Sequence, residues 1–213
     1  MTRFGKRVWL LSAGLSALAG YVDAIGFVEL GGFFVSFMSG NSTRLGVGIV
    51  ESRAAASLAG GLVAAFVLGV VAGTLVGRVS RDRRTPAVLA VVTVFLAGAA
   101  TMGSLGLAPA AAAFMALAMG AENTVFEREG EVAIGLTYMT GTLVKLGQRA
   151  TAALLGGARL AWLPYFLLWS GLVGGAVLGA LAHARLGLSS LWVAVTVASL
   201  LAAASTRIKL QQA

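Results

Sequence analysis

The chain contains no cysteine, one histidine and three prolines. Without cysteine it forms no disulfide and no thiolate metal site, and a lone histidine leaves no zinc cluster of the usual kind. No glycine-rich stretch ends in the Gly-Lys-Ser/Thr of a phosphate-binding loop, and no base is placed beside a serine nucleophile. We therefore predict that the chain is not an enzyme and holds neither a cofactor nor a resident metal ion.

Charge is also scarce, at 11% of the 213 residues, whereas a soluble domain carries about a quarter. Apolar residues make up 58% of the chain and mean hydropathy is +0.90, more than a soluble fold of this size can bury. A bilayer span needs about 20 apolar residues. The charge-free stretches fit one, two, one and one spans at 54–77, 85–121, 160–184 and 186–206. Because these runs are continuous rather than alternating, they indicate membrane helices and argue against an outer-membrane barrel.

The net charge of +8 comes from basic residues at the ends of the apolar runs, where they anchor and orient helices in the bilayer. No continuous basic stripe or aromatic platform is present, so nucleic acid is not an expected partner. Most tryptophans lie near the run ends and fit an interfacial aromatic belt. His183 is likewise expected at the membrane interface.

The chain repeats itself. Residues 20–46 align with residues 120–147, so that Asp23 pairs with Asn123 and the tetrapeptide 38–41 (MSGN) pairs with 139–142 (MTGT). Downstream, glycines spaced by four line one helix face in each half and permit close helix crossing. We pair Gly69, Gly73 and Gly77 with Gly171, Gly175 and Gly179.

We therefore divide one membrane domain into repeat 1 (residues 1–107) and repeat 2 (residues 108–213). In repeat 1 we predict helices at about 8–28, 55–79 and 86–106, with a broken segment at 33–50. In repeat 2 we predict helices at about 109–126, 160–183 and 187–206, with a broken segment at 133–149. Gly106 and Pro109 predict a tight hairpin between the two halves.

The broken segments are barely long enough to span, and each carries a polar motif containing glycine near its middle, so they either cross the membrane or re-enter it. With both re-entrant and a cytoplasmic N-terminus, 13 basic residues lie inside and 3 outside. With both spanning, the ratio is 10 to 6. The positive-inside rule favours re-entry. The prediction is an all-α integral membrane protein of the cytoplasmic (inner) membrane with six transmembrane helices, two re-entrant segments and both termini cytoplasmic. Three crossings per repeat make the repeats inverted, as in many secondary transporters.

Asp23 lies deep in the first helix, and an intramembrane carboxylate is costly and usually functional. It is a candidate to bind a cation, relay a proton or hold a polar substrate; the alternative is a helix-end carboxylate wetted at the headgroups. Asn123 is its partner in the repeat. Glu122 beside it lies either at depth or at the cytoplasmic rim. Glu127, Glu129 and Glu131 with Arg128 look like a solvated loop without a role.

The polar motifs supply the main candidate site. Unwound backbone within a membrane lines water or a ligand, or is buried by protein, and N–H groups at a helix start favour anions. Two such starts would form a site near the midplane; the alternative is that the polar groups only satisfy each other between packed helices. The candidate residues are Ser39, Gly40, Asn41, Thr140, Gly141 and Thr142.

Two further pairs of residues lie near these motifs. Arg44 and Lys145 follow them at nearly equivalent places and either attract anions or extend to the interface. Tyr21 and Tyr138 are candidates to line a cavity.

The stretch GYVDAIGFVELGGFFVSFMSGN resembles the hallmark of the YoaK family, bacterial multi-pass membrane proteins of unknown function. Gly20 to Ala24, Met38, Gly40 and Asn41 match the first-half pattern, and Ser39 replaces a threonine. In the second half Gly120, Asn123 and residues 137–142 match, but Glu122 stands where the family pattern has glutamine. The resemblance implies the class of protein and leaves the substrate open.

We predict a small secondary transporter of a polar or anionic solute, with the lipid bilayer as its surroundings. A channel-like pore and a membrane scaffold without transport are the alternatives. The glycine-rich faces are compatible both with a homodimer and with packing inside one chain.

Overall fold

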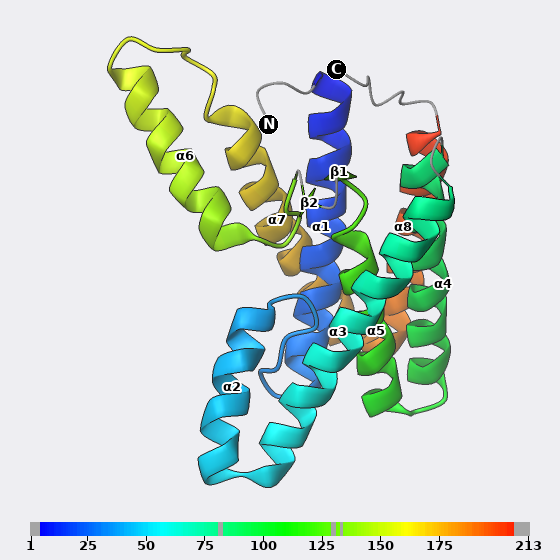
Figure 1. Ribbon diagram of the computed structural model, residues 1–213. Helices are drawn as coiled ribbons and strands as arrows, with labels where there is room; N and C mark the ends of the chain where they lie inside the picture. The colour runs from blue at the N-terminus through cyan, green and yellow to red at the C-terminus, as the bar shows by residue number, and fades with distance from the viewer. Residues whose placement is uncertain (1–4, 81–82, 129–130, 133, 207–213) are drawn as a thin grey trace.

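The computed structural model describes residues 5–80, 83–128, 131–132 and 134–206. Helices account for nearly all of these residues (Figure 1), beside one antiparallel ladder of two-residue strands. In chain order the elements are α1 (Lys6–Glu29), α2 (Met38–Glu51), α3 (Arg53–Val79), α4 (Arg84–Ser104), α5 (Ala108–Glu122), β1 (Glu127–Arg128), β2 (Glu131–Val132), α6 (Met139–Leu154), α7 (Leu163–Leu186), the 3-10 helix η2 (Gly187–Ser190) and α8 (Leu191–Ser205). The predicted all-helical class is confirmed.

Most of these helices are apolar along their whole length. Within the described residues, four stretches are long and apolar enough to cross a bilayer: Arg7–Glu29, Arg53–Val79, Arg84–Ser104 and Leu163–Ser205. The fourth has 43 residues and contains η2. There Gly187 has a φ of 55°, and α7 and α8 run in opposite directions on either side of it (Figure 1). The shorter α5 is apolar as well. This is the arrangement of a multi-pass membrane protein.

The chain also reverses between α4 and α5, where Gly106 and Pro109 predict a hairpin. Gly106 has a φ of 74°, a conformation that residues with a Cβ rarely adopt. Pro109 lies in the first turn of α5, where its missing N–H costs no helical hydrogen bond.

The main apolar core lies between α1, α4, α5 and α8. Ile25, Leu96 and Met119 are fully buried in it, and Ala194 and Ala198 bring α8 against it. Small side chains allow these helices to approach closely without polar contacts.

At two helix crossings, α1 with α7 and α3 with α5, the backbones themselves touch. Glycines at these crossings lie so close to a carbonyl oxygen of the other helix that a Cβ would overlap it. The pairs are Gly20 with Leu172, Gly175 with Ala17, Gly179 with Tyr21, Gly120 with Phe66 and Gly69 with Leu117. The glycine faces are thus occupied within the chain, which favours the alternative of packing inside one chain over that of a homodimer through these faces.

These contacts also correct the predicted pairing of the glycines by one helical turn. Gly69 faces Leu117, and Gly175 faces Ala17 in the same way. Ala17 and Leu117 each lie three positions before the aligned residues Gly20 and Gly120, so we treat them as equivalent. Gly69 therefore corresponds to Gly175 rather than to Gly171. Both series of glycines are spaced by four residues, close to the 3.6 residues of a helical turn. A shift of one series by four positions therefore still aligns glycine with glycine, and the sequence alone does not choose between the two alignments.

Helices α2 and α6 are half-length. They contain 14 and 16 residues, less than a hydrocarbon core of about 30 Å requires at about 1.5 Å per residue. The equally short α5 is apolar up to its last residue, whereas α2 carries Arg44 and α6 carries Lys145 within the helix. Short length together with these charges indicates that α2 and α6 do not cross the core. In Figure 1 both begin near mid-height, on the same side of the molecule. From there α2 runs toward its connection with α3 at one end, and α6 runs toward its connection with α7 at the other.

The interruption before each half-length helix lies earlier than predicted. We expected 33–50 and 133–149 to be broken at their glycine motifs, but these motifs form the first turns of α2 and α6. A helical glycine costs only about 1 kcal/mol relative to alanine, and neither helix contains proline, so the helix continues through the motif. The described non-helical backbone is at 30–37 before α2, and at 123–128, 131–132 and 134–138 before α6.

Candidate functional site

The entry to α2 is fixed by Asn41, a predicted solute-binding residue. Its side chain is fully buried and bonds to both backbone groups of Phe34. Oδ1 accepts from the Phe34 N–H at 3.0 Å, and Nδ2 donates to the Phe34 carbonyl at 2.6 Å. The amide therefore holds the non-helical segment against the first turn of α2. The polar atoms of Asn41 thus bond to the protein backbone, as expected if the polar residues of the motif only satisfy groups between packed helices.

Asp23 holds the same segment from α1. Its Oδ1 accepts hydrogen bonds from the N–H groups of Val35 at 2.8 Å and Ser36 at 2.7 Å. These short lengths are typical of charge-assisted hydrogen bonds. Asp23 was predicted to bind an ion, a proton or a solute; in this conformation its carboxylate anchors the chain that leads into α2.

Asn123 plays the corresponding role before α6. The Thr137 hydroxyl donates to its Oδ1 at 3.1 Å, while Nδ2 donates to the Met119 carbonyl of α5 at 2.9 Å. Asn123 and Thr137 are both buried. One polar side chain near the end of α1, and one just after α5, thus tethers the segment that leads into each half-length helix.

The starts of the two half-length helices are not capped by side chains. The N-cap residues are Phe37 and Tyr138, and neither side chain bonds to its helix. The first N–H groups of a helix have no partner within the helix and carry partial positive charge. Ser39 and Thr140 in these first turns are exposed, whereas Thr142 is buried.

The two motif glycines have different surroundings. A Cβ at Gly40 would lie 2.5 Å from the ring of Phe37 and 3.0 Å from that of Phe34, so aromatic side chains cover this position. A Cβ at Gly141 would meet no atom within 4 Å. The start of α6 is therefore more open than the start of α2.

The two tyrosines also differ. The Tyr21 hydroxyl donates to the Ser190 carbonyl at 2.9 Å, and the side chain is buried, so it joins α1 to η2 and does not line an open space. Tyr138 is 54% exposed beside the start of α6.

Arg44 and Lys145 are not brought together. The Arg44 guanidinium lies 4.8 Å from the ring centroid of Phe33, a cation–π contact. Lys145 is exposed on α6.

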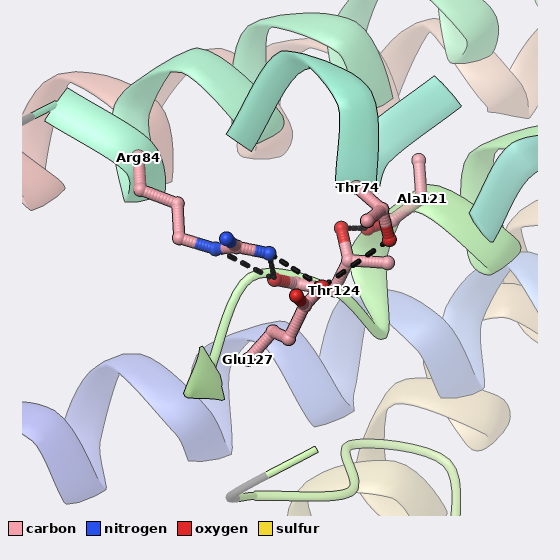
Figure 2. Close-up of polar contacts among 5 residues, drawn as sticks. All are labelled: Thr74, Arg84, Ala121, Thr124 and Glu127. Atoms are coloured by element: carbon pink, nitrogen blue, oxygen red, sulfur yellow. Dashed lines mark hydrogen bonds and ion pairs between the residues drawn. The ribbon is translucent and has the colours of Figure 1, made fainter. Parts of the chain in front are cut away.

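A cluster around Arg84, the first residue of α4, was not predicted (Figure 2). Its Nη2 lies 2.6 Å from Oε2 of Glu127 and donates to the Thr124 carbonyl. The Thr74 hydroxyl of α3 donates to the same Glu127 oxygen at 3.2 Å. The Arg84 and Glu127 side chains are only 19% and 9% exposed. The prediction that Glu127 lies in a solvated loop is therefore wrong. The nearby sequence shows no sign of this contact, because the partner of Glu127 lies 43 positions earlier in the chain.

A second polar contact joins the C-terminal ends of α1 and α7. Nε2 of His183 lies 2.9 Å from Oε2 of Glu29, and the side chains are 14% and 27% exposed. These helix ends lie opposite to the end of the molecule where α4 begins (Figure 1). The sequence predicts an interfacial His183 and gives no indication of this contact with Glu29.

Glu122, the last residue of α5, lies in the protein interior rather than at a solvated rim. It is fully buried, and neither carboxyl oxygen has a hydrogen-bond partner among the described residues. The same part of the chain contains no group of three or more His, Asp or Glu residues that could hold a metal ion.

Comparison with known proteins extends over almost the whole chain. Residues 11–204 match the family described as "Protein of unknown function (DUF1275)". The chain is 39% identical over 198 residues to the UPF0700 transmembrane protein RA0705 of Rhizobium meliloti (strain 1021), covering 93% of this chain and 86% of that relative. No solved structure matches. The helical membrane fold and these similarities agree, and the chain belongs to the DUF1275 family.

Proposed function

We propose that the chain is a small secondary transporter of the cytoplasmic (inner) membrane, with a polar or anionic small solute as substrate and no catalytic activity. The observation that carries this proposal is the pair of half-length helices, whose uncapped starts lie at mid-height and whose axes run to opposite ends (Figure 1). Non-helical backbone at membrane depth is tolerated where protein buries it or where it lines a water-filled cavity. Interrupted helices at corresponding positions build the midplane sites of many secondary transporters.

The chemistry of the α6 start favours an anionic group on the solute, whereas at α2 the Asp23 carboxylate already accepts the N–H groups just before the helix. Two uncapped starts supply N–H donors with partial positive charge, and the exposed hydroxyls of Ser39 and Thr140 add further donors. Gly141 leaves space beside them. The side chains that position these starts, rather than contact the solute, are Asp23, Asn41 and Asn123.

We further infer that α1, α3, α4, α5, α7 and α8 span the bilayer, that α2 and α6 re-enter it, and that residues 1–107 and 108–213 are inverted copies. The helix contacts support this. α1 packs on α7 as α5 packs on α3, α2 packs on α3 as α6 packs on α7, and α4 packs on α8. If α1 to α4 are exchanged with α5 to α8 in order, the α1–α7 contact becomes α5–α3, the α2–α3 contact becomes α6–α7, and the α4–α8 contact becomes itself. The N-terminal end of α1 lies with the α3–α4 and α6–α7 connections, opposite to the α2–α3, α4–α5 and α7–α8 connections (Figure 1).

Thiol labelling tests this topology directly, because the chain has no cysteine of its own. In intact bacterial cells we expect a membrane-impermeant maleimide to label Leu105→Cys in the α4–α5 hairpin. Ser80→Cys, between α3 and α4, should be labelled only after the membrane is opened. If α2 and α6 belonged to full spans, the two positions would exchange sides and the labelling pattern would be reversed. The unsubstituted chain is the blank.

The Arg84–Glu127 ion pair and the Glu29–His183 contact fit the two closures that alternating access requires. Arg84 with Glu127 joins the first turn of α4 to the chain just after α5, and Glu29 with His183 joins the ends of α1 and α7. They lie at opposite ends of the molecule (Figure 1). In the proposed cycle each pair breaks when its own end opens, and with both formed the site is closed from both sides.

A ligand screen tests the proposed site. We expect thermal-shift measurements on the detergent-purified protein, with organic anions, amino acids, nucleobases and metal ions, to find a ligand whose stabilisation is lost in Gly141→Leu. At about a hundred times its Kd, a ligand stabilises the native state by about 2.7 kcal/mol. Leucine fits at Gly141 because the space there is open, and it would project beside the start of α6.

Gly147→Leu is the matched control, because a Cβ there also meets nothing within 4 Å and the residue lies further along the same helix. It should keep the ligand effect. Equal loss in both variants would mean that the start of α6 is not the site. A well-folded sample that binds none of the probes, and carries none of them into proteoliposomes, would favour a scaffold without transport.

A further inference from the structure

Glu122 ends α5 with its carboxyl enclosed in the protein. Its exposed fraction is 0%, and neither Oε1 nor Oε2 bonds to another described residue. Asp23, the other acidic residue deep in the helix bundle, receives two backbone N–H bonds. An ionised carboxylate without any partner is very unfavourable in an apolar interior. The two carboxyl groups therefore differ: that of Asp23 has hydrogen-bond donors that stabilise an anion, whereas that of Glu122 has no donor among the described residues.

Among the charged side chains that the structure describes on the neighbouring helices, none compensates Glu122. α5 packs against α1, α3 and α4. Of the acidic and basic side chains described on these helices, Asp23, Glu29 and Arg84 bond to other groups. The remaining ones are exposed, namely Arg7, Arg53 and Arg78.

Asn123 and Thr124, which directly follow Glu122, already bond to groups other than its carboxyl. The next two residues are apolar and buried. Val125 and Phe126 belong to a cluster with Leu11, Leu15 and Leu89, which come from α1 and α4. This cluster provides no oxygen ligands. A metal cation such as Mg²⁺ or Ca²⁺ needs about six or more oxygen ligands, whereas a proton neutralises a carboxyl group without any other ligand.

We propose that Glu122 is a proton-binding site. Its carboxyl carries a proton in the conformation described here and releases that proton to water when the adjoining end of the molecule opens. The role of this release in coupling rests on the proposed transporter function, whereas the bound proton itself does not. Coupling by Glu122 would replace the coupling role first considered for Asp23.

The structure also indicates what would open this end. Arg84 binds the Thr124 carbonyl and the Glu127 carboxylate, two and five positions after Glu122 (Figure 2). It thereby fixes the turn that connects α5 to β1. When the ion pair breaks, this turn is free to move, and water gains access to the end of α5.

Infrared spectroscopy of the purified, membrane-reconstituted protein tests the site without any substrate. At neutral pH we expect the C=O stretching band of a protonated carboxylic acid in the unsubstituted protein. The band should be lost in Glu122→Gln, which has the same shape and no proton to release. It should remain in Asp23→Asn, the matched control at the other deep carboxyl. In Glu127→Gln, which removes the ion pair, the band should disappear at lower pH than in the unsubstituted protein.

An unsubstituted protein without the band, or a band unchanged in Glu122→Gln, would overturn the proposal. An identical pH titration in Glu127→Gln would overturn the release step. Size-exclusion chromatography checks that each variant is folded. A Glu122-dependent band in a protein that transports none of the screened solutes supports the proton site and contradicts the transporter function, so the two failures are distinguishable.

Discussion

Gly175→Ala should destabilise the protein by about 3 kcal/mol, the upper range for overpacking a well-packed contact. A Cβ at this position would overlap the carbonyl oxygen of Ala17, because α7 crosses α1 with its backbone in direct contact. Backbone cannot move aside as a flexible side chain can, so the two helices must separate. Thermal unfolding of the detergent-purified protein measures the loss.

Gly174→Ala is the matched control for this substitution. Gly174 is the preceding residue of the same helix, it is exposed, and a Cβ there meets nothing within 4 Å. Alanine favours the helix over glycine by about 1 kcal/mol, so this variant should unfold at the same temperature as the unsubstituted protein or slightly higher. Equal destabilisation by the two substitutions would contradict the close α1–α7 crossing.

The sequence was sufficient to predict the helical membrane class and the approximate places of the long helices. The reason is that both follow from one-dimensional properties. Lipid requires continuous apolar runs, and positions such as Gly106 and Pro109 mark where the chain reverses. The repeat also identified Asp23 and Asn123 as a pair, and both tether the segment before a half-length helix.

The roles of individual polar residues were less predictable, because they depend on contacts between distant segments. Asn41 in a polar motif looks the same in sequence whether it binds a solute or the backbone of Phe34. Glu127 lies among other charged residues, which indicates solvent exposure, yet Arg84 and Thr74 from two other helices enclose it. The depth of Glu122 depended on where α5 ends, and helix ends are the least certain part of such a prediction.

Arg84→Gln is expected to lower the free energy of unfolding by about 3 kcal/mol, the cost of removing one partner from a largely buried ion pair. The substitution leaves the Glu127 carboxylate, at 9% exposure, with the Thr74 hydroxyl and without a cation among the side chains that the structure describes. It also removes the donors to the Thr124 carbonyl. Unfolding in detergent, followed with Glu127→Gln and the double variant, gives the coupling energy between the two side chains.

Arg78→Gln is the matched control, since Arg78 is an exposed arginine in the last turn of α3, near the same end of the molecule. An exposed charge of this kind changes stability by about 0.5 kcal/mol or less. The double variant should recover part of the loss, because it leaves no unpaired carboxylate behind. If Arg84→Gln were no more damaging than Arg78→Gln, the ion pair would contribute too little free energy to hold this end of the molecule closed. Neither the alternating closure nor the release of a proton from Glu122 could then depend on it.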